Sequence, residues 1–269
     1  MDLLETFGTE TPVIGMIHLR PLPGSPQYNS SRSQILQRAK RDLDSLIEGG
    51  IDGIMIENLG DIPYYPESVP NHTVASMTHI GTRLAQESSV PMGINVLRND
   101  GPAAMSIASA INADYIRINV HLSTRRTDQG IIEGEAHETM RLREQLDSDV
   151  DVFTDVDVKH SVPLGSERPL SQLVEEHIQR GMADGIIVSG ETTGSGVDIE
   201  TLTRVVESRD AVDPSVPVFV GSGVTPDTID QLLTHANGVI VGTAIKEGKQ
   251  TENPVSPKAV KTLCNSAHE

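Results

Sequence analysis

Eight short apolar runs with helix-length stretches between them constrain the fold of this chain more than any other feature. Amphipathic periodicity is clearest at 31–50, 170–183 and 225–236. Short apolar runs that alternate with helical periodicity predict βαβ units and a parallel sheet. Eight such units predict an α/β fold with a single (β/α)8 TIM barrel. We place the strands at 13–19, 53–58, 91–97, 115–121, 150–160, 185–190, 217–223 and 238–244.

The length of the chain fits one such barrel. With 269 residues it is longer than most single domains, but α/β barrels commonly reach this size as one unit. We find no low-complexity segment and no Pro/Gly-rich linker that would divide it. We therefore expect one domain over 1–269, with a barrel core at about 11–250 and a C-terminal helix at about 256–265.

Charge and composition exclude several classes of protein. The formal charge of −17 argues against nucleic acid as a partner, because a phosphate backbone is held by clustered Lys and Arg. No apolar run approaches the length of a membrane span, and the N-terminus has no secretory pattern. The single cysteine, Cys264, fits a reducing compartment, so we expect a cytoplasmic protein. We also expect a homo-oligomer. The spread of acidic residues suggests a salt-rich, halophilic cytoplasm, with an ordinary acidic cytosolic enzyme as the alternative.

The seventh and eighth strands both end in glycine and a small hydroxyl residue. The seventh ends in Gly221, Ser222 and Gly223, and the eighth in Gly242 and Thr243. Phosphate in such barrels is frequently held by these two loops and a helix N-terminus, because small residues let backbone N–H groups approach oxygen. The alternative is that the glycines only allow tight turns. The pair of loops, at these two strands, favours a phosphate site.

Two further segments belong to this prediction. The loop after the sixth strand is rich in glycine and hydroxyl residues, and it adds Ser189, Gly190 and Gly194 to the candidate phosphate site. We expect the helix after the seventh strand to begin at Pro226, with Thr225 as its N-cap.

Polar residues close the other strands, where a TIM barrel keeps its active site. Five of them come from four strands: Glu57, Asn95, Asn119, Asp157 and Lys159. Inward polar groups are costly unless they are paired or solvated, so their convergence favours acid–base chemistry, with His18 on the first strand as a further participant. The alternatives are a polar network that only plugs the barrel, Schiff-base chemistry at Lys159, and Mg²⁺ held by Glu57 with Asp155 or Asp157.

The stretch 123–140 after the fourth strand reads as a long polar loop. Asp128 and Gln129, near its middle, are within reach of the barrel mouth as substrate-binding residues. Arg125 and Arg126 either meet an anionic substrate or are solvated charges.

Several strings together resemble the BtpA/SgcQ family. The most specific are GMIHLRPLPG at 15–24 and TDQGIIEG at 127–134, and the similarity extends from about residue 11 to 250. The resemblance implies a TIM barrel of the ribulose-phosphate-binding type. Members are described as photosystem I biogenesis factors, sugar-catabolism proteins or nucleosidases. By match to the motifs, the resemblance implies site roles for His18, Glu57, Asn58, Asp128, Gln129, Glu133, Asp157, Lys159, Ser222, Gly223, Gly242 and Thr243.

Two classes of function remain open at this point. The first is an enzyme that acts on a phosphorylated sugar or a phosphoribosyl or nucleoside-type metabolite, as an isomerase, a lyase or a glycosyl-bond-cleaving enzyme. Lys159, Asp157, Glu57, His18 and Asn119 would be its catalytic residues, and Asn58, Asn95, Asp128, Gln129 and Glu133 would bind substrate. The second is a non-catalytic assembly or stability factor for a membrane complex. A sensor that binds a phosphorylated metabolite without turning it over is a third possibility.

Overall fold

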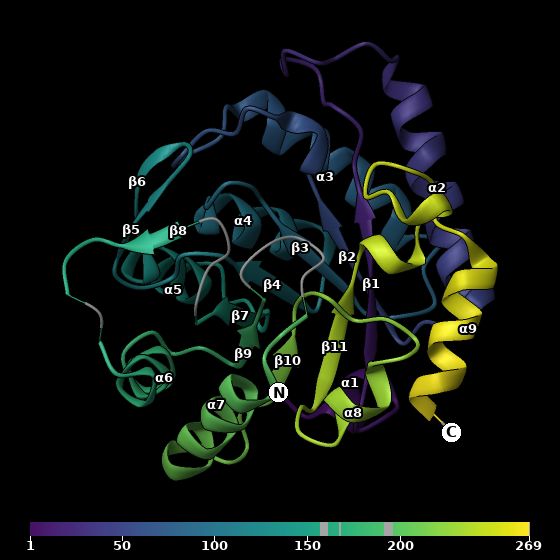
Figure 1. The fold of residues 1–269 in the computed structure, drawn as a ribbon. Helices are drawn as coiled ribbons and strands as arrows, with labels where there is room; N and C mark the ends of the chain where they lie inside the picture. Colours follow the sequence, from purple (N-terminus) through teal and green to yellow (C-terminus); the bar gives the residue numbers. More distant parts are fainter. Residues whose placement is uncertain (157–160, 167, 191–195, 269) are drawn as a thin grey trace.

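Eight parallel strands close into a barrel in the order β1-β11-β10-β9-β7-β4-β3-β2, which confirms the predicted TIM barrel (Figure 1). The computed structural model describes residues 1–269 except 157–160, 167, 191–195 and 269. The barrel strands are β1 (Val13–His18), β2 (Gly53–Glu57), β3 (Met92–Asn95), β4 (Tyr115–Ile118), β7 (Asp151–Asp155), β9 (Gly185–Val188), β10 (Val218–Val220) and β11 (Gly238–Val241).

One helix follows each barrel strand and packs outside the barrel. These helices are α2 (Arg32–Gly49), α3 (Asn71–Ala85), α4 (Gly101–Ile111), α5 (Ala136–Gln145), α6 (Leu170–Gln179), α7 (Ile199–Val212), α8 (Ile229–Leu233) and α9 (Pro257–His268). Short 3-10 turns lie at η1 (Leu59–Asp61), η2 (Thr243–Ile245) and η3 (Glu247–Lys249). The last helix, α9, packs beside α2 and so closes the ring of helices (Figure 1).

Local signals explain the helix ends. A capping box between Ser31 and Gln34 begins α2, and Gly50 ends it with a positive φ of 86°. The predicted start of α8 at Pro226 is wrong: the helix begins at Ile229. The hydroxyl of Thr228 binds the backbone N–H of Thr225 at 3.0 Å, so this turn is closed by a side chain before the helix begins.

The end of the barrel at which the strands begin is filled by stacked aromatic rings. Phe7 from the N-terminal helix α1 (Leu3–Phe7) enters the barrel beside Tyr115, with 5.7 Å between ring centroids. Phe153 and Phe219 continue the stack. Glycine on neighbouring strands makes room for these rings: a Cβ on Gly93 would lie 2.1 Å from a Tyr115 ring carbon. The polar inward residues are therefore confined to the other end of the barrel.

The stretch predicted as a long polar loop forms a sheet instead. Strands β5 (Thr124–Thr127) and β6 (Gly130–Glu133) form a hairpin, and β8 (Ser161–Pro163) pairs with β5 on the other side. Ile132 is fully buried against Val120, while Ile131 faces solvent. This alternation across the hairpin is the signal of a half-buried strand, and the reading of this stretch by polarity alone missed it.

The predicted strand at 150–160 is shorter in the structure. Strand β7 ends at Asp155, and Asp157 and Lys159 lie outside the described residues. Within the described part of the chain, no helix is both long and apolar enough to cross a membrane.

Candidate functional site

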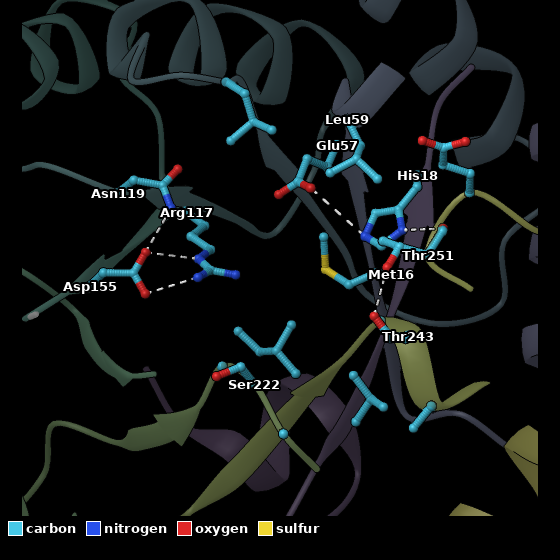
Figure 2. Close-up of a pocket in the computed structure, with 18 of the residues that line it drawn as sticks. Met16, His18, Glu57, Leu59, Arg117, Asn119, Asp155, Ser222, Thr243 and Thr251 are labelled. Atoms are coloured by element: carbon cyan, nitrogen blue, oxygen red, sulfur yellow. Dashed lines mark hydrogen bonds and ion pairs between the residues drawn. The ribbon is translucent and has the colours of Figure 1, made fainter. Parts of the chain in front are cut away.

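A cavity of about 710 Å³ opens at the C-terminal ends of the barrel strands. Its lining comes from β1, β2, β4, β7 and β11 and from the loops that follow β2, β3, β4, β10 and β11. Figure 2 shows the polar side chains that face one another across it, with Arg117 and Asp155 on one side and His18 and Glu57 on the other. This is the end of the fold at which TIM-barrel proteins bind ligands.

Strand register brings the polar residues of β1 to β4 into one layer. His18 pairs with Glu57, Glu57 with Asn95, and Asn95 with Arg117. Residues in register on parallel strands point to the same face of the sheet. All four are inward-facing, in the layer directly above the aromatic stack.

An ion pair anchors the β4 side of the cavity. Arg117 donates from Nε and Nη2 to the two oxygens of Asp155 at 3.1 and 2.9 Å. Asn119 donates to the same carboxylate at 2.8 Å and accepts from Asn95 at 3.2 Å. Burial alone would lower the pKa of Arg117, but the charge and hydrogen bonds of Asp155 outweigh this effect and raise it. The guanidinium is therefore a fixed cation in the cavity wall.

His18 lies on the opposite wall with a defined tautomer. Its Nδ1 is 3.1 Å from the carbonyl oxygen of Thr251. A carbonyl can only accept, so Nδ1 carries the hydrogen and Nε2 has a free lone pair. Nε2 lies 3.7 Å from Oε1 of Glu57. Burial, assisted by the charge of Lys246, lowers the pKa of His18 to about 3, so the imidazole is neutral near pH 7.

Lys246 stands behind the cavity wall and was not predicted. It is 2% exposed, and its Nζ donates to the carbonyl of Met16 at 2.8 Å. Burial lowers the pKa of this lysine to about 8. It follows η2 in the segment that also carries Thr251, so this one segment both orients His18 and helps keep it neutral.

The loops after β10 and β11 form a cradle of backbone N–H groups. Gly223 and Val224 belong to the first loop and Thr243 and Ala244 to the second, and all four residues line the cavity. Within the described part of the chain, none of these four N–H groups donates a hydrogen bond. Gly223 has a φ of 70°, a conformation that favours glycine. Backbone N–H groups without an acceptor in a cavity wall can bind an anion.

Hydroxyl groups hold the cradle in place. Ser222 accepts from the backbone N–H of Gly190 at 2.8 Å, which joins the loops after β9 and β10. The hydroxyls of Thr243 and Thr251 lie 2.8 Å apart and join the loop after β11 to the segment that orients His18. These contacts link the cradle to the neighbouring walls of the cavity.

The cavity contains most, though not all, of the residues selected from the sequence. Those that line it are His18, Glu57, Asn119, Asp128, Gln129, Asp155, Ser222, Gly223, Gly242 and Thr243. Five others lie outside the lining: Asn58, Asn95, Glu133, Ser189 and Gly190. Asp157, Lys159 and Gly194 lie outside the described residues.

The residues outside the lining have other contacts. The amide of Asn58 binds both the N–H and the carbonyl of Leu97, at 2.7 and 3.3 Å, so it joins two loops instead of facing a ligand. Glu133 is exposed on β6. Ser189 lies under the site, with its hydroxyl 3.5 Å from Asp155.

The predicted magnesium site fits poorly at Asp155, while its alternative ligand Asp157 lies outside the described residues. The two oxygens of Asp155 already accept from Arg117 and Asn119, so a divalent cation there would compete with a buried guanidinium. In the part of the chain that the structure describes, no cluster of three His, Cys, Asp or Glu could hold a metal ion.

Arg117 is the main site residue that sequence reasoning missed. Alternation along 115–121 could have found it, because Tyr115, Arg117 and Asn119 share one face of the strand. Of these, only Asn119 was selected from the sequence. His121, two residues further on, is buried outside the lining with Nε2 2.7 Å from the carbonyl of Gly181.

The fold and the cavity define a TIM-barrel protein with a polar ligand cavity at the C-terminal end of its strands. The chain belongs to the BtpA family, whose model matches residues 9–269. It is 42% identical to the photosystem I biogenesis protein BtpA of Synechocystis over 269 residues, which covers 100% of this chain and 92% of the relative. An uncharacterized protein of Thermococcus kodakarensis is 45% identical over 258 residues, covering 96% of this chain and 95% of that protein.

Comparison with solved structures agrees on the fold. The structure of N-(5'-phosphoribosyl)anthranilate isomerase from Pyrococcus furiosus matches with a TM-score of 0.57 and 13% identity, covering 96% of this chain and 98% of that one. A similarity at this level of identity shows the shared barrel.

Proposed function

We propose that this protein is an enzyme that acts on a small phosphorylated sugar or a phosphoribosyl metabolite by acid–base chemistry. The observation that carries the proposal is that one cavity is lined by both an N–H cradle and an acid–base pair. Gly223, Val224, Thr243 and Ala244 form the cradle, and His18 and Glu57 form the pair. The phosphoribosyl compound named for the Pyrococcus furiosus barrel is consistent with this class of substrate.

The two parts of the cavity have complementary tasks. Binding of the phosphate in the cradle supplies binding energy remote from the reacting atoms and orients the sugar. The neutral His18 can accept a hydrogen bond from a substrate hydroxyl at Nε2, and the Glu57 carboxylate beside it can take a proton from the carbon skeleton. The fixed cation of Arg117 can stabilise the negative charge that follows.

A thermal-shift screen tests the phosphate part of the proposal. Inorganic phosphate, triose and pentose phosphates and nucleotides are each added with and without Mg²⁺. A ligand at about 100 times its Kd adds roughly 2.7 kcal/mol of stability, and each kcal/mol raises Tm by about 2–4 °C in a domain of this size. We expect the largest shift with a sugar phosphate.

A matched pair of variants locates the binding site. Ser222→Asp places a carboxylate at the cradle, whereas Ser222→Asn has the same shape without the charge. We expect the sugar-phosphate shift to disappear in the first variant and to persist in the second. If no phosphate compound raises Tm, or if both variants retain the full shift, the cradle does not bind phosphate.

Turnover is tested at His18 and at Lys159. The family resemblance assigns a site role to Lys159, which lies outside the described residues. Once a substrate is identified, His18→Asn and Lys159→Ala should each lower kcat without abolishing phosphate binding. Full turnover in both variants would contradict acid–base chemistry by these residues.

A second candidate function is a non-catalytic factor for assembly of a membrane complex. It is favoured by the name of the Synechocystis relative, which is similar over the full length of this chain. Three exposed apolar side chains on and beside the β6-β5-β8 sheet, Ile131, Val162 and Leu164, offer a contact surface for a partner. Retention of the protein on membranes after a high-salt wash, and its loss with Ile131→Lys, would favour this function.

A further inference from the structure

We infer that the natural ligand is a phosphorylated hydroxy-aldehyde or hydroxy-ketone, whose carbonyl oxygen binds Arg117 while a neighbouring hydroxyl donates to Nε2 of His18. This inference rests on the proposed function, because it takes the cradle as the phosphate site. It adds a binding residue, Arg117, and distinguishes a carbonyl sugar from a polyol or a nucleoside.

Arg117 still has N–H groups that can donate to a ligand. Asp155 takes the hydrogen of Nε and one hydrogen of Nη2. Nη1 has no acceptor among the residues that the structure describes, and Figure 2 shows the third guanidinium nitrogen turned away from Asp155 toward the middle of the cavity. A guanidinium only donates, so its partner in the ligand must be an acceptor, and an oxygen with negative charge binds best.

The guanidinium of Arg117 lies beside the cradle. A Cβ on Gly221 would lie 3.5 Å from Nη2 of Arg117, so the guanidinium borders the strand end from which the first cradle loop departs. A ligand with its phosphate in the cradle therefore extends past Arg117. The geometry gives the ligand an acceptor oxygen a few atoms from its phosphate.

The wall opposite Arg117 presents hydrogen-bond acceptors instead of donors. Nε2 of His18 is an acceptor, and Oε1 of Glu57 lies 3.7 Å from it, too far for a direct hydrogen bond between them. Gln129, in the cavity lining, also has a buried Oε1 that accepts no hydrogen bond from the described residues. Nε2 of His18 and Oε1 of Gln129 can each accept a hydrogen bond, and the hydroxyl groups of a sugar provide the donors.

The two walls together select the ligand class. A hydroxy-carbonyl compound presents an oxygen that only accepts next to a hydroxyl that donates, which matches Arg117 on one side and His18 on the other. A polyol lacks the oxygen that only accepts. Of the residues described in the lining, Tyr64 is the one Phe, Tyr or Trp side chain, so two-sided stacking of a nucleobase between such rings is not provided.

Calorimetry with matched ligands tests the inference. Glycerol 3-phosphate and ribitol 5-phosphate carry phosphate and hydroxyls but no carbonyl. The corresponding acids, 3-phosphoglycerate and 5-phosphoribonate, place carboxylate oxygens where the carbonyl oxygen would lie. A hydrogen bond to a charged group contributes enough for a tenfold or greater preference, so the acid of at least one pair should bind about tenfold more tightly than its polyol.

Variants assign the preference to Arg117. Arg117→Met combined with Asp155→Leu removes the ion pair without changing net charge, and it should abolish the preference for the acid while the polyol still binds. Arg117→Lys retains the charge without the fork of donors, so it should reduce the preference for the acid. This variant provides the test if the double variant does not fold. His18→Asn preserves the donor to Thr251 but lacks Nε2, so it should weaken acid and polyol equally.

The outcomes distinguish this inference from the function on which it rests. If phosphate compounds bind but the wild type does not prefer either acid, Arg117 does not bind a carbonyl oxygen and the inference is wrong, while the phosphate site stands. An acid preference that persists in both Arg117 variants also overturns it. If none of the phosphate compounds binds, the proposed function and this inference fail together.

Discussion

The proton affinity of His18 gives a quantitative test of the chemistry assigned to the cavity. Burial lowers the pKa of His18 from its ordinary value of 6.5 to about 3 in the folded protein. The unfolded chain therefore binds a proton between these two pH values that the folded protein does not bind. Above pH 6.5 this histidine therefore does not lower the unfolding free energy. As the pH falls from 6.5 toward 3, it lowers the unfolding free energy progressively.

The size of the effect follows from the two pKa values. Between pH 7 and pH 5, the linkage relation gives a loss of about 2 kcal/mol of unfolding free energy from this one residue. His18→Asn removes the titrating group but retains a donor for the Thr251 carbonyl. The unfolding free energy of the wild type should therefore fall by about 2 kcal/mol more than that of the variant over this range.

Urea titrations at half-unit pH steps measure this difference. Comparison with the variant is necessary because other buried groups also titrate, and Asp151, whose pKa burial raises to about 6, acts in the opposite direction. His177→Gln provides a second comparison, since burial also lowers the pKa of His177 to about 3, but this residue lies outside the cavity lining. A difference curve for His18→Asn that is flat from pH 7 to pH 5 would refute a neutral His18 and its role as an acceptor.

Three further predictions concern packing and burial. Gly93→Ala should lower the unfolding free energy measured in urea by about 3 kcal/mol, because the new Cβ would lie 2.1 Å from a buried tyrosine ring carbon. Gly196→Ala, with open space around it, should change this free energy by less than about 0.5 kcal/mol. Arg117→Met should lower the unfolding free energy by about 3–5 kcal/mol, because it leaves the carboxylate of Asp155 buried without its cation. Adding Asp155→Leu should recover most of this loss. Equal stability of the single and double variants would contradict this prediction. Burial raises the pKa of the Cys264 thiol to about 12, so its alkylation at pH 8 should be slow until denaturant is added. Rapid labelling of the folded protein would show that helix α9, which carries Cys264, opens.

The fold was accessible from the sequence because its signals are repeated. All eight barrel strands lie within the predicted ranges, since the β-branched runs are short and the stretches between them are amphipathic. The predictions failed where a signal occurs once. Helix α8 begins three residues later than proposed, because the Thr225–Thr228 contact closes the preceding turn. The hairpin of β5 and β6 was hidden by its charged residues, although Ile131 and Ile132 alternate across it.

The site was only partly accessible for a related reason. Position at the end of a strand identified His18, Glu57 and the glycine loops, because barrel topology brings strand ends together. Pairing between side chains cannot be read in the same way. Arg117 has its role because Asp155, 38 residues away, comes within hydrogen-bond distance. Similarly, Asn58 looked like a binding residue, and only the structure shows that Leu97 occupies its amide.

The most direct test of the account is a titration of the ¹⁵N-labelled protein with glycerol 3-phosphate, followed by the amide resonances of the cradle. We predict that the signals of Gly223, Val224, Thr243 and Ala244 shift together, with one shared Kd, and that Ser222→Asp abolishes the shifts. Cradle amides that stay unchanged while resonances elsewhere on the surface move would contradict a phosphate site at the ends of β10 and β11.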